Sequence, residues 1–215
     1  MIYKKSIPFQ FTPDDVKIIS KSYLYRGFFS IIKYRFKHKL FHNNYWSKEI
    51  QREVFERGNG GVVLPYDPHV DKVLLIEQIR IPAIKNSVTP WLLEAISGMQ
   101  EKNETLEELI RREAKEEAGI LLQRYHYVLS YLSSPGGTTE RIYINIGEID
   151  TSIIKDKSLH GLKTQNEDIR IHIVDRLKAY KWVQLGIIDN AATVIAIQWL
   201  QLNHIMLKKH WLHNS

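Results

Sequence analysis

Apolar and polar residues alternate along the first quarter of the chain in the pattern of antiparallel β-strands. The alternation runs from Val16 to Phe41, and a further strand is expected from Gln51 to Arg57. The turn-forming sequence Asn59-Gly60-Gly61 then interrupts the pattern. We therefore expect a small antiparallel unit over residues 1–57 and a second domain over residues 58–215. So few strands bury little apolar surface, which favours packing of this unit on a second copy of itself.

Strand-like and helix-like segments are mixed in the second domain. Strands are expected at residues 62–66, 73–80, 91–96, 127–132, 141–149 and 169–174. Helices are expected at residues 106–118, 175–184 and 189–210, and a polar loop at residues 150–166. Strands before and after a central helix, with a helix closing the chain, predict an α+β layered fold.

The central helix has well-marked ends. Thr105 followed by Glu108 is a capping box, which predicts that the helix begins at Leu106. Gly119 suits the left-handed residue that commonly follows the end of a helix, so the helix should end at Ala118. The inward stripe, at spacings of three and four residues, begins with apolar side chains and continues with carboxylates. In order, it is Leu106, Leu109, Ile110, Glu113, Glu116, Glu117 and Ile120.

Three carboxylates therefore occupy helix positions where the pattern calls for apolar residues. Glu113 and Glu117 are four residues apart and repel each other, and burying unpaired carboxylates costs far more. A bound divalent cation relieves both costs, and oxygen ligands with room left for water suit Mg²⁺. The alternative is a solvated acidic face, which is less favoured because these acids share a face with apolar residues.

Composition is that of an ordinary soluble globular protein, with 44% hydrophobic and 25% charged residues in a chain of 215. The absence of cysteine excludes disulfides and thiolate metal sites, and it fits a reducing cytosol. The first residues lack a secretory apolar core. The most apolar long stretch, Ala191 to Leu207, contains interspersed polar residues and reads as a buried helix rather than a membrane span. We therefore expect a cytoplasmic protein without membrane contact.

The net charge of +6 raises the question of a nucleic-acid or membrane partner. The basic residues are scattered, however, and those in Lys33–Lys39 alternate with aromatic residues, as on a solvated strand face. Recognised nucleic-acid-binding motifs are absent from the sequence. We therefore expect no nucleic-acid partner and suggest that the positive field helps to recruit a small anionic substrate.

The segment from Gly98 to Ile120 also carries a known signature. It reads Gly, five residues, Glu, seven residues, Arg-Glu, an apolar residue, any residue, Glu-Glu, any residue, Gly and an apolar residue. At all nine defined positions this segment resembles the Nudix box. Other segments are similar to bacterial ADP-ribose pyrophosphatases, namely residues 25–29, 52–53, 76–80, 134–141, 166–170 and 188–192. The resemblance covers essentially the whole chain and implies a Nudix α/β/α sandwich with an N-terminal β unit used in dimerisation.

The resemblance implies a metal site for Mg²⁺, with Mn²⁺ as a possible substitute. The implied ligands are Glu113, Glu117, the main-chain carbonyl of Ser97 and, from a later loop, Glu167. Ser97 departs from the small apolar residue expected there, but a carbonyl ligand tolerates this change. Glu116 is expected to be a further ligand to metal or water, and Glu104 to be structural or in the outer shell of the metal site. Arg112 can pair with Glu108 and Glu116 at helical spacing, and we interpret it as orienting the carboxylates.

Arg80 ends an apolar strand, and its guanidinium can bind a pyrophosphate in a bidentate manner. The resemblance makes Arg80 a diphosphate ligand, whereas the alternative is a surface salt bridge. The loop Ser134-Pro135-Gly136-Gly137 can present backbone N–H groups to an anion or can be a plain hairpin loop. Glu140 could accept hydrogen bonds from ribose hydroxyls, and Met99 completes this part of the substrate site.

The N-terminal unit is expected to hold the adenosine part of the substrate. In the resembling enzymes, adenine and ribose are bound by residues of the partner subunit, at the positions of Phe28, Phe29, Arg52, Glu53 and Arg57. Phe and Arg offer stacking surfaces to a base. The alternative for two adjacent aromatic residues in a strand is a place in the core. The resemblance thus implies a homodimer with shared active sites.

One residue departs from the family pattern at a catalytic position. The glutamate that activates water in this branch lies two residues before the metal ligand, and here that position is Gln165. A neutral amide cannot accept a proton, and a lost general base typically costs about 10²- to 10⁴-fold in rate. Glu167, Glu140 or Glu116 could take over the role.

The sequence therefore predicts a Mg²⁺-dependent pyrophosphohydrolase that cleaves ADP-ribose to AMP and ribose 5-phosphate. Two alternatives stay open. Gln165 is compatible with a catalytically weak ADP-ribose-binding protein, and the sugar of the nucleoside diphosphate sugar substrate is not fixed by the sequence.

Overall fold

The computed structural model describes residues 8–162, 164 and 166–213, and the chain divides into two compact units. The first unit comprises the chain up to Arg57 together with Ser133–Glu140, and the second comprises Gly58–Leu132 and the chain from Arg141 onward. The segment Ser133–Glu140 groups with the first unit, although the sequence pattern places it within the second domain.

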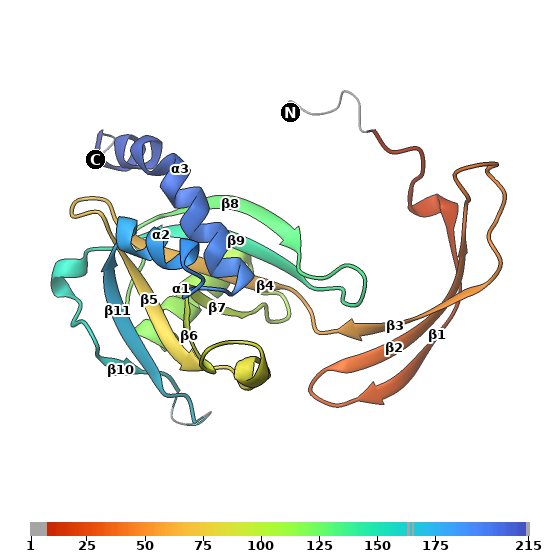
Figure 1. Ribbon diagram of the computed structural model, residues 1–215, viewed down its shortest axis with the longest axis horizontal. Coiled ribbons are helices and arrows are strands. Elements are labelled where there is room, and N and C mark those ends of the chain that lie inside the picture. Colours follow the sequence, from red (N-terminus) through yellow and green to blue (C-terminus); the bar gives the residue numbers. More distant parts are fainter. Residues whose placement is uncertain (1–7, 163, 165, 214–215) are drawn as a thin grey trace. The chain divides into compact units, whose positions relative to one another are not determined.

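The first unit is a three-stranded antiparallel sheet (Figure 1). After a short 3₁₀ turn, Pro13–Asp15, come β1 (Val16–Arg26), β2 (Ser30–His38) and β3 (Ile50–Glu56), in the order β1-β2-β3. Among its described residues, Ile32 is the only buried apolar residue, with 8% of its surface exposed. The unit therefore has almost no core of its own, as the small number of strands predicts.

The segment Ser133–Glu140 lies along the free edge of β3. The Phe55 N–H donates to the Gly137 carbonyl at 2.8 Å, and the Thr139 N–H donates to the Phe55 carbonyl at 3.3 Å. The Thr139 hydroxyl also donates to the Glu56 carboxylate at 3.0 Å. These bonds explain why this segment belongs to the first unit.

The second unit contains an eight-stranded mixed sheet. Its strands are β4 (Gly60–Asp67), β5 (Lys72–Ile79), β6 (Trp91–Glu94), β7 (Ile96–Met99), β8 (Tyr125–Leu132), β9 (Arg141–Glu148), β10 (Leu159–His160) and β11 (Ile169–Asp175). The order is β10-β11-β5-β4-β9-β8, with β6 paired to β5 and β7 paired to β4. Only β4 and β9 pair in parallel among these described strands.

The strands β4 and β5 form a hairpin but stay paired only beside their turn, at Tyr66–Val73 and Asp67–Lys72. Beyond that point β6 pairs with β5 and β7 pairs with β4. The chain therefore changes its partner strand at Ala95, a buried residue in the middle of the sheet. Because of this change, Glu94 lies opposite Ile76 of β5, whereas Ile96 lies opposite Val63 of β4.

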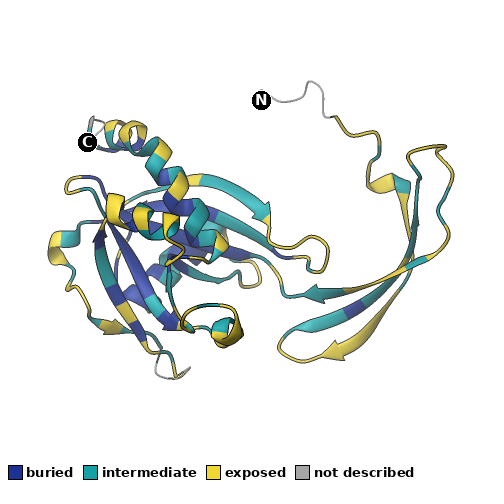
Figure 2. Ribbon diagram, viewed as in Figure 1, coloured by how far each residue is buried: buried dark blue, intermediate teal, exposed yellow. Residues whose placement is uncertain are grey.

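Helices cover both faces of this sheet (Figures 1 and 2). Helix α1 (Leu106–Ala118) packs on the core that contains Val63 and Leu74. Helices α2 (Arg176–Gln184) and α3 (Ala191–His213) pack on the opposite core, which contains Leu64. The predicted α/β/α sandwich is confirmed. Helix α3 is not apolar enough to cross a membrane, and neither is any other helix in the described part of the chain.

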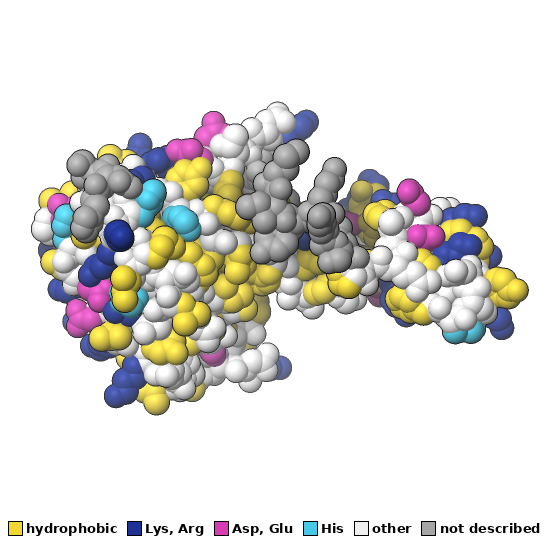
Figure 3. Space-filling model, turned by 90° about the horizontal axis from the view of Figure 1, so that it is seen from above, with side chains coloured by type: hydrophobic (Ala, Val, Ile, Leu, Met, Phe, Trp, Pro, Cys, Tyr) yellow, Lys and Arg dark blue, Asp and Glu magenta, His cyan; other side chains and the backbone are white. Residues whose placement is uncertain are grey.

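Two regions differ from the expectation. The strand expected at residues 91–96 is divided at Ala95 into β6 and β7, which pair with different strands. The segment expected as a polar loop at residues 150–166 contains a 3₁₀ turn, Thr151–Ile153, and the two-residue strand β10, which pairs with β11. A strand of two residues is too short to produce a periodic pattern. On the face shown in Figure 3, Lys and Arg side chains are interspersed with acidic and apolar ones, in keeping with their scattered positions along the sequence.

Candidate metal and diphosphate site

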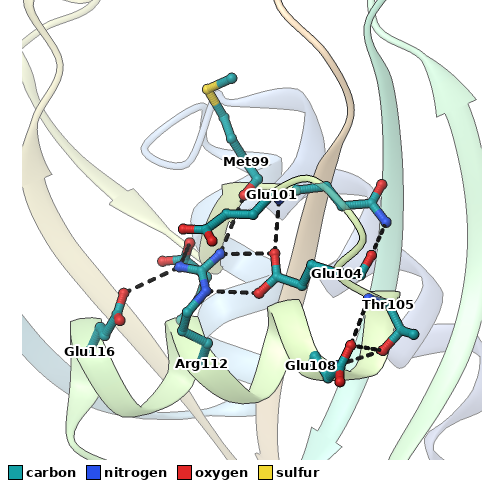
Figure 4. A network of polar contacts seen from close by, with 9 residues as sticks. Met99, Glu101, Glu104, Thr105, Glu108, Arg112 and Glu116 are labelled. Atoms are coloured by element: carbon teal, nitrogen blue, oxygen red, sulfur yellow. Dashed lines mark hydrogen bonds and ion pairs between the residues drawn. The ribbon is translucent and has the colours of Figure 1, made fainter.

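Helix α1 is capped at both ends as predicted. The Thr105 side chain accepts from the Glu108 N–H, and the Glu108 carboxylate accepts from the Thr105 N–H at 2.8 Å (Figure 4). Gly119 has a φ of +65°, and its N–H donates to the last turn of the helix. Because both ends are fixed, the glutamates on the inward face have defined positions relative to the sheet.

Arg112 is the centre of a dense polar network on α1 (Figure 4). Its Nε and Nη2 donate to both oxygens of Glu104, at 2.8 and 3.1 Å, in a bidentate pair. Its Nη1 donates to Glu113 at 2.8 Å and to Glu116 at 3.3 Å. The expected pairing with Glu116 is confirmed, whereas the expected pairing with Glu108 is wrong, because the Glu108 carboxylate is engaged in capping Thr105.

The Glu113 side chain lies directly against the backbone of Gly98. A Cβ atom at Gly98 would lie 1.6 Å from Oε1 of Glu113, which is far inside any contact distance. The first glycine of the sequence signature is therefore required by a side chain of the same signature, 15 residues later in the chain.

Glu117 is the most buried carboxylate of the helix, with 5% of its surface exposed. Its partners are two neutral donors, the Ser97 N–H at 3.1 Å and the Gln78 amide at 3.4 Å. Burial raises the pKa of Glu117 to about 8, and the charges of Glu113 and Glu94 act in the same direction. A carboxylate in this environment is stabilised in its charged form by a cation.

Glu113 and the later loop lie close enough to interact. Burial raises the pKa of Glu113, and the negative charges of Glu116 and Glu167 contribute, while Arg112 opposes the shift. The Glu167 carboxylate accepts from the Leu162 N–H at 3.0 Å, which closes its own loop. Gln165, the substituted base position, lies outside the described residues.

The predicted metal ligands are chemically suited to a hard divalent cation, but their oxygens do not point toward one common position. Among the described residues, no group of three or more His, Asp or Glu side chains is arranged to hold a metal ion. The carboxylates of Glu113 and Glu116 point to Arg112, and Glu117 points to Ser97 and Gln78. All the predicted ligands are carboxylate or carbonyl oxygens, the kind that Mg²⁺ prefers.

Arg80 lies beside this acidic group, and two neighbours of Arg80 escaped the sequence analysis. The Arg80 Nε donates to the Glu94 carboxylate at 2.8 Å. Glu94 and Gln78 are both buried. The sequence does contain a sign of Glu94, which is a charged residue directly after the apolar run Trp91-Leu92-Leu93. A buried strand rarely carries an unpaired charge, so such a residue is expected to have a partner.

The predicted adenosine-binding residues all belong to the first unit. Phe28 is 87% exposed, so it is not a core residue. Its ring lies edge-on to Phe29, and the Arg57 guanidinium lies 5.4 Å from the centre of the Phe29 ring. Arg57 also pairs with the buried Glu140 at 3.0 Å. Four of the predicted residues therefore form one cluster.

The other predicted residues of the first unit lie at the surface. Arg52 and Glu53 are exposed on β3, and Arg52 donates to the main-chain carbonyl of Gln51 at 2.7 Å. Ser134, Pro135 and Gly136 are exposed in the segment beside β3. Met99, by contrast, belongs to the second unit, where its carbonyl accepts from Arg112 at 3.3 Å.

Comparison with known proteins adds independent information. The sequence model of the NUDIX domain family matches residues 57–214. The ADP-ribose pyrophosphatase of Escherichia coli (strain K12) is 54% identical to this chain, covering 98% of it and 100% of the relative. That of Haemophilus influenzae is 44% identical, covering 94% and 93%. A GDP-mannose pyrophosphatase of Cronobacter sakazakii is 35% identical, covering 73% and 80%.

A solved structure described as an ADP compounds hydrolase has a similar fold. The TM-score is 0.69 over 92% of this chain and 96% of the other, with 15% sequence identity. At this identity the likeness concerns the fold alone.

Proposed function

Since the chain belongs to the NUDIX family, we propose that it is an ADP-ribose pyrophosphatase, which adds water across the diphosphate of ADP-ribose to release AMP and ribose 5-phosphate. The observation that carries this proposal is the 54% identity to the E. coli enzyme over that enzyme's whole length. The complete signature on a doubly capped helix, with its acidic side chains directed inward, supports it.

The reaction would require Mg²⁺, or Mn²⁺ in its place. Glu113, Glu117, Glu167 and the Ser97 carbonyl would hold the metal, with Glu116 as a further ligand to the metal or to its water. The fit is supported by Glu117, a buried carboxylate whose hydrogen-bond donors in the described chain are neutral. When bound, the cation would neutralise charge on the diphosphate and acidify a water molecule. The chain's own contribution is to hold the carboxylates, and the contacts of Arg112 to Glu104, Glu113 and Glu116 support this role.

Arg80 would bind the diphosphate. Its side chain is 40% exposed, and its Nε makes its single side-chain hydrogen bond within the described residues. Both Nη groups therefore stay available for the two oxygens of a phosphate. Met99 would contribute to the substrate site from the strand next to the metal ligands.

The proton acceptor would differ from the usual one of the family, because Gln165 cannot act as a base. The three replacements are Glu116, Glu140 and Glu167. Glu140 is buried and paired with Arg57, and Glu167 is bonded to its own loop. Glu116 makes only a 3.3 Å contact to Arg112 and lies next to the metal ligand Glu117, so we favour it.

The adenosine part would be bound by Phe28, Phe29, Arg52, Glu53 and Arg57, with Ser134, Pro135, Gly136 and Glu140 from the segment beside β3. We propose that these residues act across a homodimer, as in the family. The nearly coreless first unit supports dimerisation, since β1 exposes a run of large apolar residues. These are Val16, Ile18, Ile19, Tyr23, Leu24 and Tyr25.

A cytoplasmic location is part of the proposal and is supported by the absence of cysteine. Two other functions are favoured by specific observations. The substitution at Gln165 favours a weak enzyme that chiefly binds ADP-ribose. The 35% identity to a GDP-mannose pyrophosphatase favours a different nucleoside diphosphate sugar.

One experiment separates these possibilities. Purified protein is incubated with ADP-ribose, GDP-mannose and other nucleoside diphosphate sugars, with and without Mg²⁺, and nucleotide release is followed by chromatography. The proposal predicts that AMP release from ADP-ribose is the fastest reaction and that EDTA abolishes it. Tight binding of ADP-ribose without AMP release would instead identify a binding protein.

A further inference from the structure

Glu94 is a carboxylate that has little contact with solvent. Its side chain is 11% exposed, and it is the last residue of β6, opposite Ile76 in β5. The two residues point to the same face of the sheet, the face covered by α1. A single carboxylate at such a position destabilises the protein unless it is paired. The Arg80 guanidinium supplies the pairing, at 2.8 Å.

The pair is directional. Glu94 accepts from Nε of Arg80, so that the edge of the guanidinium with both Nη groups faces away from Glu94. A lysine could not be oriented in this way, because its donors all belong to one freely rotating ammonium group and define no plane. Glu94 therefore fixes the plane of the side chain that is proposed to bind the diphosphate.

Gln78 links this pair to the proposed metal site. Its amide donates to Glu117 at 3.4 Å. Burial raises the pKa of Glu94, and the charge of Arg80 and the Gln78 side chain oppose this shift. The charge of Arg80 in turn acts on Glu117. The buried Gln78 amide thus lies beside both Glu117 and the Arg80–Glu94 pair.

The backbone around Glu94 is held from the opposite face of the sheet. At Ala95 the chain leaves β5 for β4, so the Ala95 N–H lacks a strand partner and donates instead to the buried Thr193 hydroxyl at 2.8 Å. On the other side of Glu94, the Leu93 carbonyl accepts from Asn190 at 2.8 Å. The beginning of α3 therefore fixes both neighbours of Glu94.

We infer that Glu94 is a positioning residue for substrate binding, which orients Arg80 toward the diphosphate while α3 holds Glu94 in register. This inference rests on the proposed function. It goes further in assigning a role to a residue outside the signature helix and in giving the first turn of α3 a part in building the site.

The test is a double-mutant cycle between Glu94→Gln and Arg80→Ala, with KM, kcat and melting temperature measured for each protein. Glu94→Gln should raise the KM for ADP-ribose on the order of tenfold, with a change in kcat below about threefold. In the Arg80→Ala background the same substitution should change KM by less than about twofold, because there is no arginine left to orient. It should also restore part of the melting temperature lost in Arg80→Ala, since that variant leaves a buried carboxylate unpaired.

The control is Glu148→Gln. Glu148 is likewise buried and pairs with Arg124, whose side chain is 39% exposed, close to the 40% of Arg80. This variant should lower the melting temperature and leave KM unchanged, because the pair is only structural. Calorimetric titration of ADP-ribose in EDTA measures the dissociation constant without turnover, and it should rise in Glu94→Gln as KM does.

The outcomes separate the two proposals. If the wild type binds ADP-ribose but releases no AMP, the proposed activity fails, and the calorimetric cycle still tests the orientation of Arg80. If the wild type is active and Glu94→Gln raises KM by the same factor with and without Arg80, the positioning role is overturned. If Glu94→Gln lowers only the melting temperature, as in the control, Glu94 is structural. A wild type that neither binds nor cleaves ADP-ribose overturns both.

Discussion

The Glu113 carboxylate occupies the space that a side chain on Gly98 would need, with Oε1 only 1.6 Å from the position of the absent Cβ. Strand β7, which contains Gly98, and the acidic face of α1 are therefore closely fitted to each other.

Gly98→Ala should displace Glu113 while leaving the sheet intact. The three atoms nearest to the new methyl group all belong to the flexible Glu113 side chain, so the cost in stability should be small, about 1–2 kcal/mol. The loss of a proposed metal ligand should lower kcat by at least about tenfold. The measurement is kcat as a function of Mg²⁺ concentration, together with urea unfolding. Unchanged metal dependence would show that Glu113 is not a ligand.

Glu117 should make stability depend on pH when no metal is present. Burial raises its pKa to about 8 from an ordinary 4.5, so folding favours the protonated form. Its contribution to stability is complete below about pH 4.5 and is lost as the pH rises through 8. In EDTA the free energy of unfolding of the wild type should fall from about pH 5 to pH 8, by on the order of 1–4 kcal/mol more than that of Glu117→Gln.

Urea unfolding at both pH values measures this difference. Added Mg²⁺ should reverse the trend in the wild type alone, because a metal binds the deprotonated carboxylate. Equal pH slopes for the two proteins would contradict the raised pKa. Glu117→Gln should also have almost no activity while keeping its fold.

Subunit mixing should restore activity if the sites are built across a dimer. Chains with Glu117→Gln lack a proposed metal ligand, and chains with Arg52→Ala lack a proposed adenosine-binding residue of the first unit. Each variant alone should be inactive or nearly so. In a mixed dimer one of the two sites receives intact residues from both chains, and activity should return. Sedimentation as a monomer, or no recovery despite demonstrated subunit exchange, counts against shared sites.

Gln165→Glu should raise kcat by about tenfold or more, which corresponds to lowering the barrier by about 1.4 kcal/mol. The reason is that a carboxylate at this position can accept a proton from water. Substrate affinity should change little, because the residue acts on water and not on the sugar. If kcat stays the same while Glu116→Gln or Glu140→Gln abolishes activity, the base lies at one of those residues.

Local signals in the sequence were enough to predict α1 with both its caps, because a helix end depends on residues within four positions of it. They predicted the pairing of Arg112 with Glu116 but not its other partners. Helical spacing pointed to Glu108, but the bidentate partner is Glu104, which precedes the helix and is brought back by the loop. The path of a loop produces no periodic pattern in the sequence, so this contact could not be predicted from spacing.

The link between Arg80 and Glu94 escaped the sequence for a related reason. The pairing depends on a strand that changes its neighbour at Ala95, and a change of partner within a sheet is a tertiary event. A single charged residue at the end of an apolar run was visible, but the residue that compensates it lies 14 positions away.

The segment Ser133–Glu140 has a consequence for any attempt to cut this protein into modules. The chain passes between the two units three times, after Arg57, after Leu132 and after Glu140. A fragment starting at Gly58 would keep the signature helix but lose β3, and the main-chain groups of the segment that bond to Phe55 would lose their partners. The family model matches residues 57–214, but this region alone lacks the partners of these backbone groups. The smallest piece expected to fold with all its backbone hydrogen bonds formed is therefore the whole chain.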